Sequence, residues 1–179
     1  MKEAFLKSSC TTVQVDTSFD FDSSKYKLCA FCYLNPTTNR AELEALAFLA
    51  EETADNFRSS FKYFKSMCAA SPPSVFIVDK DFTEITVLKE VFIQSTILLC
   101  TFHVIKYVKN LIATAPVTVD IKNSVMTNFK EMVYACTEEI YEDRKNAFLL
   151  STAGGLQVRT NKQYVPLKEQ FMNLSLIHI

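Results

Sequence analysis

The order of apolar and polar positions along the chain predicts a mixed sheet first and helices afterwards. Residues 11–19 alternate Val13 and Val15 with polar neighbours, and residues 26–34 are rich in aromatic residues and cysteines. Both patterns are typical of strands. The Asp- and Ser-rich residues 20–24 between them predict a turn, so we expect the two strands to pair antiparallel.

Residues 41–50 carry conflicting signals. Ala, Glu and Leu dominate this segment and favour a helix, whereas its position between two turns suits a third strand. We predict a strand, followed by a helix that Thr53 caps. The apolar residues of that helix recur at spacings of three and four and predict one face packed on the sheet: Phe57, Phe61, Phe64 and Cys68.

A strand, a helix and a second strand follow in the next part of the chain. Residues 75–78 are apolar and β-branched and end at Asp79, which predicts a buried parallel strand with an acid at its C-terminal edge. Asp81 and Glu84 have the spacing of a capping box for a helix over residues 82–92, whose apolar stripe is Ile85, Leu88 and Phe92. Residues 96–99 predict the second parallel strand of a right-handed crossover.

The remainder of the chain predicts helices. One helix opens at Cys100-Thr-Phe-His103 and runs to a break near Pro116, and another spans residues 138–150 and ends before Gly154-Gly155. Between them lies an apolar helical stripe formed by Val125, Phe129, Met132, Val133 and Cys136. The fold class that we predict is therefore α/β, a mixed sheet flanked by helices and followed by an all-helical insertion or tail.

Composition limits the class of protein without identifying it. The 179 residues are 49% hydrophobic, enough for the core of one domain. The chain has a formal net charge of -1, so it lacks the excess of Lys and Arg that most nucleic-acid-binding proteins have. We expect an intracellular protein, because no segment reaches the length of a membrane span and the six cysteines are scattered through apolar segments, as in reduced proteins.

Four short motifs together resemble one family. The predicted element order is similar to that of ribonuclease-H-like nucleases and DDE transposases. Val-Asp16-Thr-Ser-Phe and Val-Asp79-Lys-Asp-Phe-Thr-Glu resemble the first two acidic motifs of Mutator-like (MULE) transposases, and Cys100-Thr-Phe-His103 resembles their Cys-x-x-His motif. Glu52 in Ala-Glu-Glu-Thr matches the acidic residue that these transposases have before the first helix. The amino-acid sequence most resembles the transposase-derived domain of zinc finger SWIM domain-containing proteins, over residues 1–173.

The resemblance implies a site, a cofactor and a partner. Asp16 and Asp79 would be catalytic acids and metal ligands, holding Mg²⁺ or Mn²⁺, which prefer oxygen ligands. It also implies DNA as partner and a nuclear location. The alternative interpretation gives both acids structural roles only: Asp16 begins a turn and Asp79 caps a helix. Asp81 competes with Asp79 for the metal role, but helix capping accounts for Asp81, so we favour Asp79.

The chain departs from the family at several points. Ile93 stands where the family has Pro, and neither the third acid, in an Asn-Asn-x-x-Glu-Ser-like segment, nor the SWIM zinc finger has a match. Residues 174–179 resemble a translated sequencing adapter, so we expect a non-native tail there. The predicted organisation is an incomplete RNase H-like core over residues 11–113, a helical insertion over 114–173 and this tail.

Several roles stay open at the level of sequence. Cys100 and His103 could pack beside the acidic edge, bind zinc or act in nucleophilic catalysis. We favour packing, because a closed zinc site needs four ligands. Cys29 and Cys32 lie three apart on a strand and so point to opposite faces. Lys106 and Lys109 could face a phosphate backbone, although a solvated helix face explains them as well.

The sequence therefore predicts a transposase-derived RNase H-like domain, catalytically inactive, that serves nucleic-acid or protein association. Two alternatives remain: a catalytic fragment of an active MULE transposase, and a protein-interaction scaffold. The presence of a third acid would favour the first. Tolerance of Asn at Asp16 and Asp79 would favour the second.

Overall fold

The computed structural model describes residues 12–18, 25–35, 37–38, 40–68, 71–152, 157–160 and 163–167. The chain divides into two compact units, Met1–Cys100 and Thr101–Ile179. Each unit has its own set of buried apolar side chains, so the two are described separately. The functional division predicted at residues 113 and 173 remains a prediction, and the tail lies outside the described residues.

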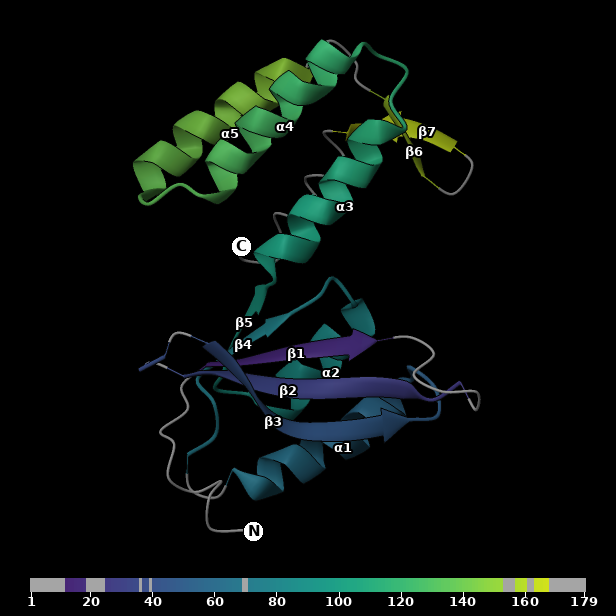
Figure 1. Ribbon diagram of the computed structural model, residues 1–179, viewed down its shortest axis with the longest axis vertical. Coiled ribbons are helices and arrows are strands. Elements are labelled where there is room, and N and C mark those ends of the chain that lie inside the picture. Colours follow the sequence, from purple (N-terminus) through teal and green to yellow (C-terminus); the bar gives the residue numbers. More distant parts are fainter. Residues whose placement is uncertain are drawn as a thin grey trace. The chain divides into compact units, whose positions relative to one another are not determined.

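The first unit is a five-stranded mixed sheet with two helices (Figure 1). The strands lie in the order β3-β2-β1-β4-β5. Strands β1, β2 and β3 pair antiparallel, whereas β4 pairs parallel with both β1 and β5. The bounds are β1 Thr12–Ser18, β2 Lys27–Asn35, β3 Arg40–Leu49, α1 Ala54–Met67, β4 Val75–Val78, α2 Phe82–Val91 and β5 Thr96–Leu99. The predicted order of elements and the mixed sheet are confirmed.

Strand pairing decides the conformation of the segment whose propensity favoured a helix. Residues 40–49 form β3 and pair with β2 along its whole length, with a register shift between Phe31 and Cys32. The turn before β3 is fixed by Asn35, whose Oδ1 accepts hydrogen bonds from the backbone N–H groups of Thr37 and Thr38. The partner strand therefore overrides the weak local preference for helix.

Helices α1 and α2 cover one face of the sheet. Thr53 caps α1 as predicted, its Oγ1 accepting from the N–H of Asn56 at 3.3 Å. Phe31 of β2 stacks on Phe64 with ring centroids 4.3 Å apart and meets Phe61 edge to face at 5.9 Å. The predicted aromatic face of α1 is thus the core of this unit.

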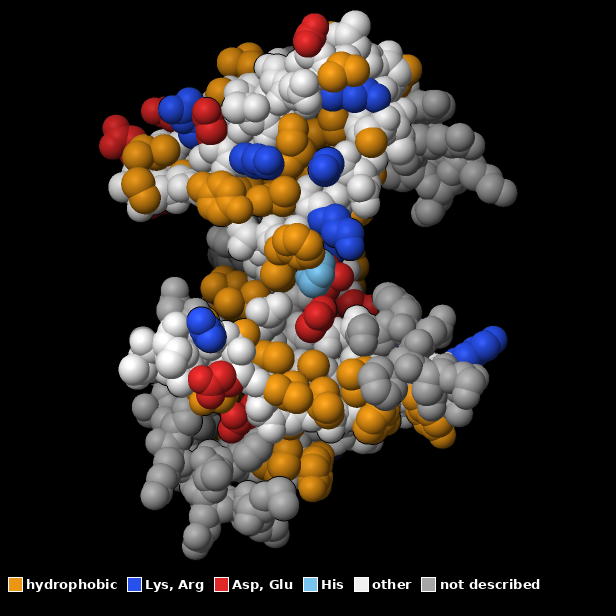
Figure 2. Space-filling view, viewed as in Figure 1, with side chains coloured by type: hydrophobic (Ala, Val, Ile, Leu, Met, Phe, Trp, Pro, Cys, Tyr) orange, Lys and Arg blue, Asp and Glu red, His pale blue; other side chains and the backbone are white. Residues whose placement is uncertain are grey.

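The other face of the sheet keeps large apolar side chains at the surface. Leu34, Leu43, Leu46 and Phe48 lie on β2 and β3 and are 47–59% exposed. Figure 2 shows hydrophobic side chains gathered over these strands. An exposed apolar area of this kind is a feature of association surfaces.

The second unit contains three helices and a hairpin. The helices are α3 Thr101–Ala113, α4 Val119–Val133 and α5 Glu138–Thr152, and α4 and α5 lie side by side (Figure 1). Phe129 and Phe148 join α4 to α5 with ring centroids 5.4 Å apart. Cys136, predicted on the apolar stripe of α4, lies beyond the helix and is exposed, because α4 ends at Val133.

Strands β6 Gln157–Thr160 and β7 Gln163–Pro166 form an antiparallel pair that the sequence analysis did not predict. Each has four residues, too few for a clear two-residue periodicity to stand out. Among the described residues, no helix is long and apolar enough to cross a membrane.

Candidate metal-binding edge of the sheet

The first two predicted acids lie on neighbouring strands, Asp16 within β1 and Asp79 directly after β4. Gln14 of β1 is paired in parallel register with Ile77 of β4, and Asp16 and Asp79 each come two residues later. Both aspartates are exposed. Parallel pairing therefore brings the two acids to the same edge of the sheet, where α/β proteins gather ligands. Their assignment as metal ligands remains a prediction.

Asp81 has the structural role predicted for it. It is the N-cap of α2, and its Oδ1 accepts a hydrogen bond of 2.9 Å from the backbone N–H of Glu84. This contact satisfies one of the free N–H groups at the start of the helix. Asp79, by contrast, accepts from the neighbouring N–H of Lys80 at 2.6 Å and caps no helix.

Glu84 completes only half of the predicted capping box. Its N–H bonds Asp81, but its side chain turns inward: the residue is 2% exposed, and its Oε1 has no hydrogen-bond partner. Burial, followed by the charges of Asp81, Asp79, Asp16 and Glu52 in that order, raises the pKa of Glu84 to about 8. Among the described residues, Glu84 is the one charged side chain that is buried.

The sequence analysis gave Glu84 only a helix-capping role, although a signal for its burial was present. Glu84 precedes Leu88 by four residues and Val91 by seven, which places it on the same helical face as these two buried side chains. An acid on the apolar face of a helix is uncommon, because a buried charge requires compensation. The helical spacing therefore pointed to a special role for this residue.

Cys29 belongs to the interior, and Cys32 is half-buried. Cys29 is buried, and burial followed by the charge of Glu84 raises the pKa of its thiol to about 12. Burial and the charge of Asp16 also raise the pKa of Cys32. Since the thiolate is the metal ligand and the nucleophile, both shifts disfavour such chemistry.

Cys100 and His103 fall in different units. Cys100 directly follows β5, and its backbone N–H donates to the carbonyl of Val78 at 2.6 Å, beside the strand that leads to Asp79. His103 lies half-buried in the first turn of α3, with its ring edge-on to Phe102 at 5.3 Å. The packing role predicted for this pair remains a prediction.

The donor chemistry at the sheet edge suits a hard cation. As the side chains stand, the described residues contain no group of three His, Cys, Asp or Glu that could hold a metal ion. Carboxylate oxygens are nevertheless the ligands that Mg²⁺ and Mn²⁺ prefer, and the buried Oε1 of Glu84 has no other partner. Asp16 and Asp79 are the exposed carboxylates at this edge.

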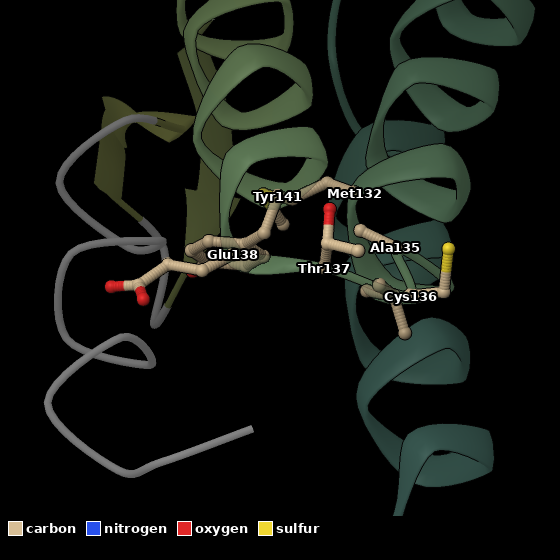
Figure 3. Close-up of a pocket in the computed structure, with 7 residues that line it drawn as sticks. Met132, Ala135, Cys136, Thr137, Glu138 and Tyr141 are labelled. Atoms are coloured by element: carbon tan, nitrogen blue, oxygen red, sulfur yellow. The ribbon is translucent and has the colours of Figure 1, made fainter.

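The pocket shown in Figure 3 lies elsewhere, at the turn between α4 and α5. It has a volume of about 300 Å³, and its lining includes Met132, Thr137, Glu138 and Tyr141. The carboxylate of Glu138 points away from the other labelled side chains. The pocket therefore lacks the convergent polar groups that define a small-molecule site.

The sheet order, the parallel pairing of β1 with β4 and the two acids at its edge define a protein of the RNase H-like class. The family model "Zinc finger SWIM domain-containing protein 1/3, RNaseH-like domain" matches residues 1–98. The chain belongs to this family.

Solved structures of viral DNA-processing proteins are also similar to the chain. The catalytic core of HTLV-2 integrase, solved in complex with magnesium as a dimer, is 12% identical to this chain with a TM-score of 0.36. The match covers 76% of this chain and 83% of the integrase chain. The fowlpox virus Holliday junction resolvase is 10% identical with a TM-score of 0.32, covering 79% and 99%. No curated protein matches the chain.

Proposed function

We propose that the RNase H-like domain associates with nucleic acid without cleaving it, through a divalent cation held by Asp16 and Asp79. The observation that carries this proposal is the pair of aspartates that parallel pairing of β1 and β4 brings to one sheet edge. Membership of an RNase H-like family supports it. DNA is the partner that the resemblance to transposases favours.

A bound cation would supply positive charge that the composition of the chain does not provide. With a formal net charge of -1, the chain has no overall excess of Lys and Arg for binding phosphates. Asp16 and Asp79 would hold Mg²⁺ or Mn²⁺, and the bound ion supplies a positive charge that attracts phosphate oxygens. Association should therefore depend on the cation more than on lysines such as Lys106 and Lys109, both exposed on α3.

The proposal of association without cleavage rests on the number of acids. The resembling transposases use three, and the 179 residues hold motif matches for two of them. Two carboxylates hold two metal ions poorly, and phosphodiester cleavage of this type uses a pair of ions. The nuclear location implied by the resemblance is part of the same proposal, and imaging of the tagged protein in cells tests it.

The test is binding of fluorescently labelled duplex DNA, measured by anisotropy with Mn²⁺ and with EDTA. We expect EDTA to weaken binding to the unchanged protein at least about tenfold, since it removes the positive charge at the edge. Asp16→Asn and Asp79→Asn should bind as weakly with Mn²⁺ as the unchanged protein does with EDTA. Asp55→Asn is the matched control, because this acid of the same unit has a side chain that is 92% exposed.

Two results would overturn the proposal. Equal binding with Mn²⁺ and EDTA, unaffected by either substitution at the edge, would contradict cation-dependent association. Cleavage of the labelled DNA by the unchanged protein and not by Asp79→Asn would instead support an active transposase fragment.

A second candidate function is protein association. The exposed apolar side chains Leu34, Leu43, Leu46 and Phe48 on one face of β2 and β3 favour it. Under this alternative, Asp16→Asn and Asp79→Asn leave function intact, and DNA binding depends neither on Mn²⁺ nor on the two aspartates.

A further inference from the structure

We propose that the outer edge of β3 binds an extended segment of another protein, rich in apolar residues and carrying a Lys or Arg, which adds to the sheet as a further strand beside residues 45–49. This inference goes beyond cation-dependent DNA binding and does not depend on it. It gives the second candidate function, protein association, a binding mode and a class of partner.

The first argument is the position of β3 in the sheet. β3 is an end strand in the order β3-β2-β1-β4-β5, and within the described residues it pairs with β2 alone (Figure 1). An edge strand presents a row of backbone N–H and C=O groups that a further strand can pair with. Proteins that keep such an edge unpaired often make it short or place Lys or Pro on it. β3 has ten residues and contains neither of these residue types, so its edge is open to strand addition.

The second argument identifies the part of β3 that can accept a strand. The register shift between Phe31 and Cys32 leaves Glu44 without a paired residue on β2. Residues 45–49, by contrast, pair with β2 one to one, from Ala45 opposite Phe31 to Leu49 opposite Lys27. An irregular pairing bends a strand, whereas a regular one keeps its outer backbone groups in line. The regular segment also has the usual length of a strand.

The third argument is the apolar surface on both sides of this segment. On the side of α1, a groove of about 280 Å³ lies between β3 and the helix, and its lining includes Ala45, Ala47 and Met67. The two alanines have small side chains, which leaves room for larger side chains of an added strand. On the other side, Leu46 and Phe48 are 47% and 59% exposed. Because successive side chains of a strand point to opposite faces, an apolar strand would fill the groove and cover Leu46 and Phe48 together.

The fourth argument is charge, which indicates the chemistry of the partner. β3 carries two acids, Glu42 and Glu44, and one base, Arg40 at its start. The Glu42 carboxylate accepts hydrogen bonds from the Tyr33 hydroxyl and, at 2.7 Å, from Asn35 Nδ2. Burial, followed by the charge of Glu42, raises the pKa of Glu44. A Lys or Arg opposite Glu44 would offset this repulsion, since opposite charges on neighbouring strands stabilise a sheet.

A second copy of this chain does not supply that charge. Two copies paired antiparallel over residues 45–49 would be centred on Ala47, because a two-fold axis makes the interface self-complementary. Glu44 of each copy would then lie opposite Ala50 of the other, which carries no charge. Charge therefore favours a basic segment of a different protein over self-association.

The test begins with selection against the whole chain from a phage-displayed library of random peptides of about ten residues, enough for one strand. We expect the enriched peptides to alternate apolar residues with others and to contain Lys or Arg. The most enriched peptide, synthesised with a fluorescent label, is then the probe, and its binding is measured by anisotropy. The absence of enrichment, or enrichment of acidic peptides, would overturn the inference.

Two variants of β3 locate the binding site of the probe. Glu44→Lys reverses the charge that the basic residue meets and should weaken binding at least about tenfold. Phe48→Ser removes an exposed apolar side chain, should also weaken binding, and keeps the test decisive if Glu44→Lys does not fold. Asp55→Lys is the matched control, because it makes the same change of charge in the same unit at a side chain that is 92% exposed. It should bind as the unchanged protein does, and equal binding by all three variants would contradict the site.

Backbone methylation separates strand addition from simple apolar docking. Successive N–H groups of a strand point to opposite edges, so probes that are N-methylated at odd or at even positions lose hydrogen bonding along different edges. We expect one pattern to weaken binding at least about tenfold and the other to leave it nearly unchanged. Equal effects of the two patterns would overturn strand addition.

Two further measurements separate the alternatives. Light scattering without peptide should show no dimer, whereas a dimer that Phe48→Ser dissociates would assign the edge to a second copy and overturn this inference. Asp16→Asn and Asp79→Asn should bind the probe as the unchanged protein does. Failure of the probe to bind at β3 therefore leaves cation-dependent DNA binding standing, because that function is measured with DNA and these two variants.

Discussion

At the residue scale, the backbone and the side chain of Glu84 lie in different environments. Its backbone serves the helix by donating to Asp81, and its carboxyl lies buried among acids. Glu52, before α1, has its pKa raised by burial and by Asp81, and Lys27 partly offsets this. The start of α2 is therefore a region of concentrated negative charge at the edge of the sheet.

The raised pKa of Glu84 predicts how stability depends on pH. The folded protein holds this proton up to about pH 8, whereas the unfolded chain releases it near the ordinary pKa of 4.5, so unfolding releases a proton between these limits. We expect the free energy of unfolding, measured by urea denaturation in EDTA, to fall as pH rises from about 4.5 to about 8. Each unit of pKa difference corresponds to about 1.4 kcal/mol, so the loss is on the order of a few kcal/mol.

Glu84→Gln removes the titrating group and should flatten this fall. Glu90→Gln should keep it, since that exposed side chain is not among the groups around the buried carboxyl. The same slope in Glu84→Gln as in the unchanged protein would contradict the assignment of this pH dependence to the Glu84 carboxyl.

At the element scale, aromatic packing on one side of α1 holds the first unit together. Phe57, Phe61 and Phe64 are at most 2% exposed and contact one another or Phe31 of β2. The opposite side of the helix carries polar residues and Tyr63, which is 69% exposed. This contrast follows directly from the helical periodicity of the sequence.

Two aromatic residues of α1 provide a matched comparison. Phe61→Ala removes a ring from the core, and we expect it to lower the free energy of unfolding by about 3–5 kcal/mol. Tyr63→Ala removes a ring from the surface and should change it by no more than about 0.5 kcal/mol. Chemical denaturation followed by circular dichroism measures both. Similar losses in the two variants would contradict the burial pattern of α1.

At the scale of the whole molecule, the chain has two hydrophobic cores. The first contains the aromatic residues between the sheet and its helices, and the second contains Phe129, Phe148 and their apolar neighbours in α4 and α5. The candidate site belongs to the first unit, which contains Asp16, Asp79 and Glu84. The match to the RNase H-like family covers nearly all of that unit.

Hydrogen exchange tests this division of the core. Phe129→Ala should raise amide exchange in α4 and α5, because Phe129 packs against Phe148, while the amides of β1, β4 and α1 keep their protection. Tyr134→Ala is the control, since this side chain at the end of α4 is 69% exposed. A uniform rise in exchange over both units would show that they unfold as one cooperative body.

Local patterns in the sequence determined most of the elements and the place of two acids. The strand before Asp79, the caps Thr53 and Asp81 and the aromatic face of α1 depend on interactions within a few residues, so spacing and residue type predict them. The acids within β1 and directly after β4 followed from the same patterns together with the family resemblance.

Tertiary structure decided the features that depend on distant partners. Residues 40–49 are a strand because β2 pairs with them, against their local helix propensity. The short strands β6 and β7 lack a pattern long enough to predict. Glu84 is buried among acids because the fold packs α2 against a sheet whose edge carries Asp16 and Asp79. Local spacing determines the type of an element, whereas the environment of a charge depends on which elements the fold brings around it.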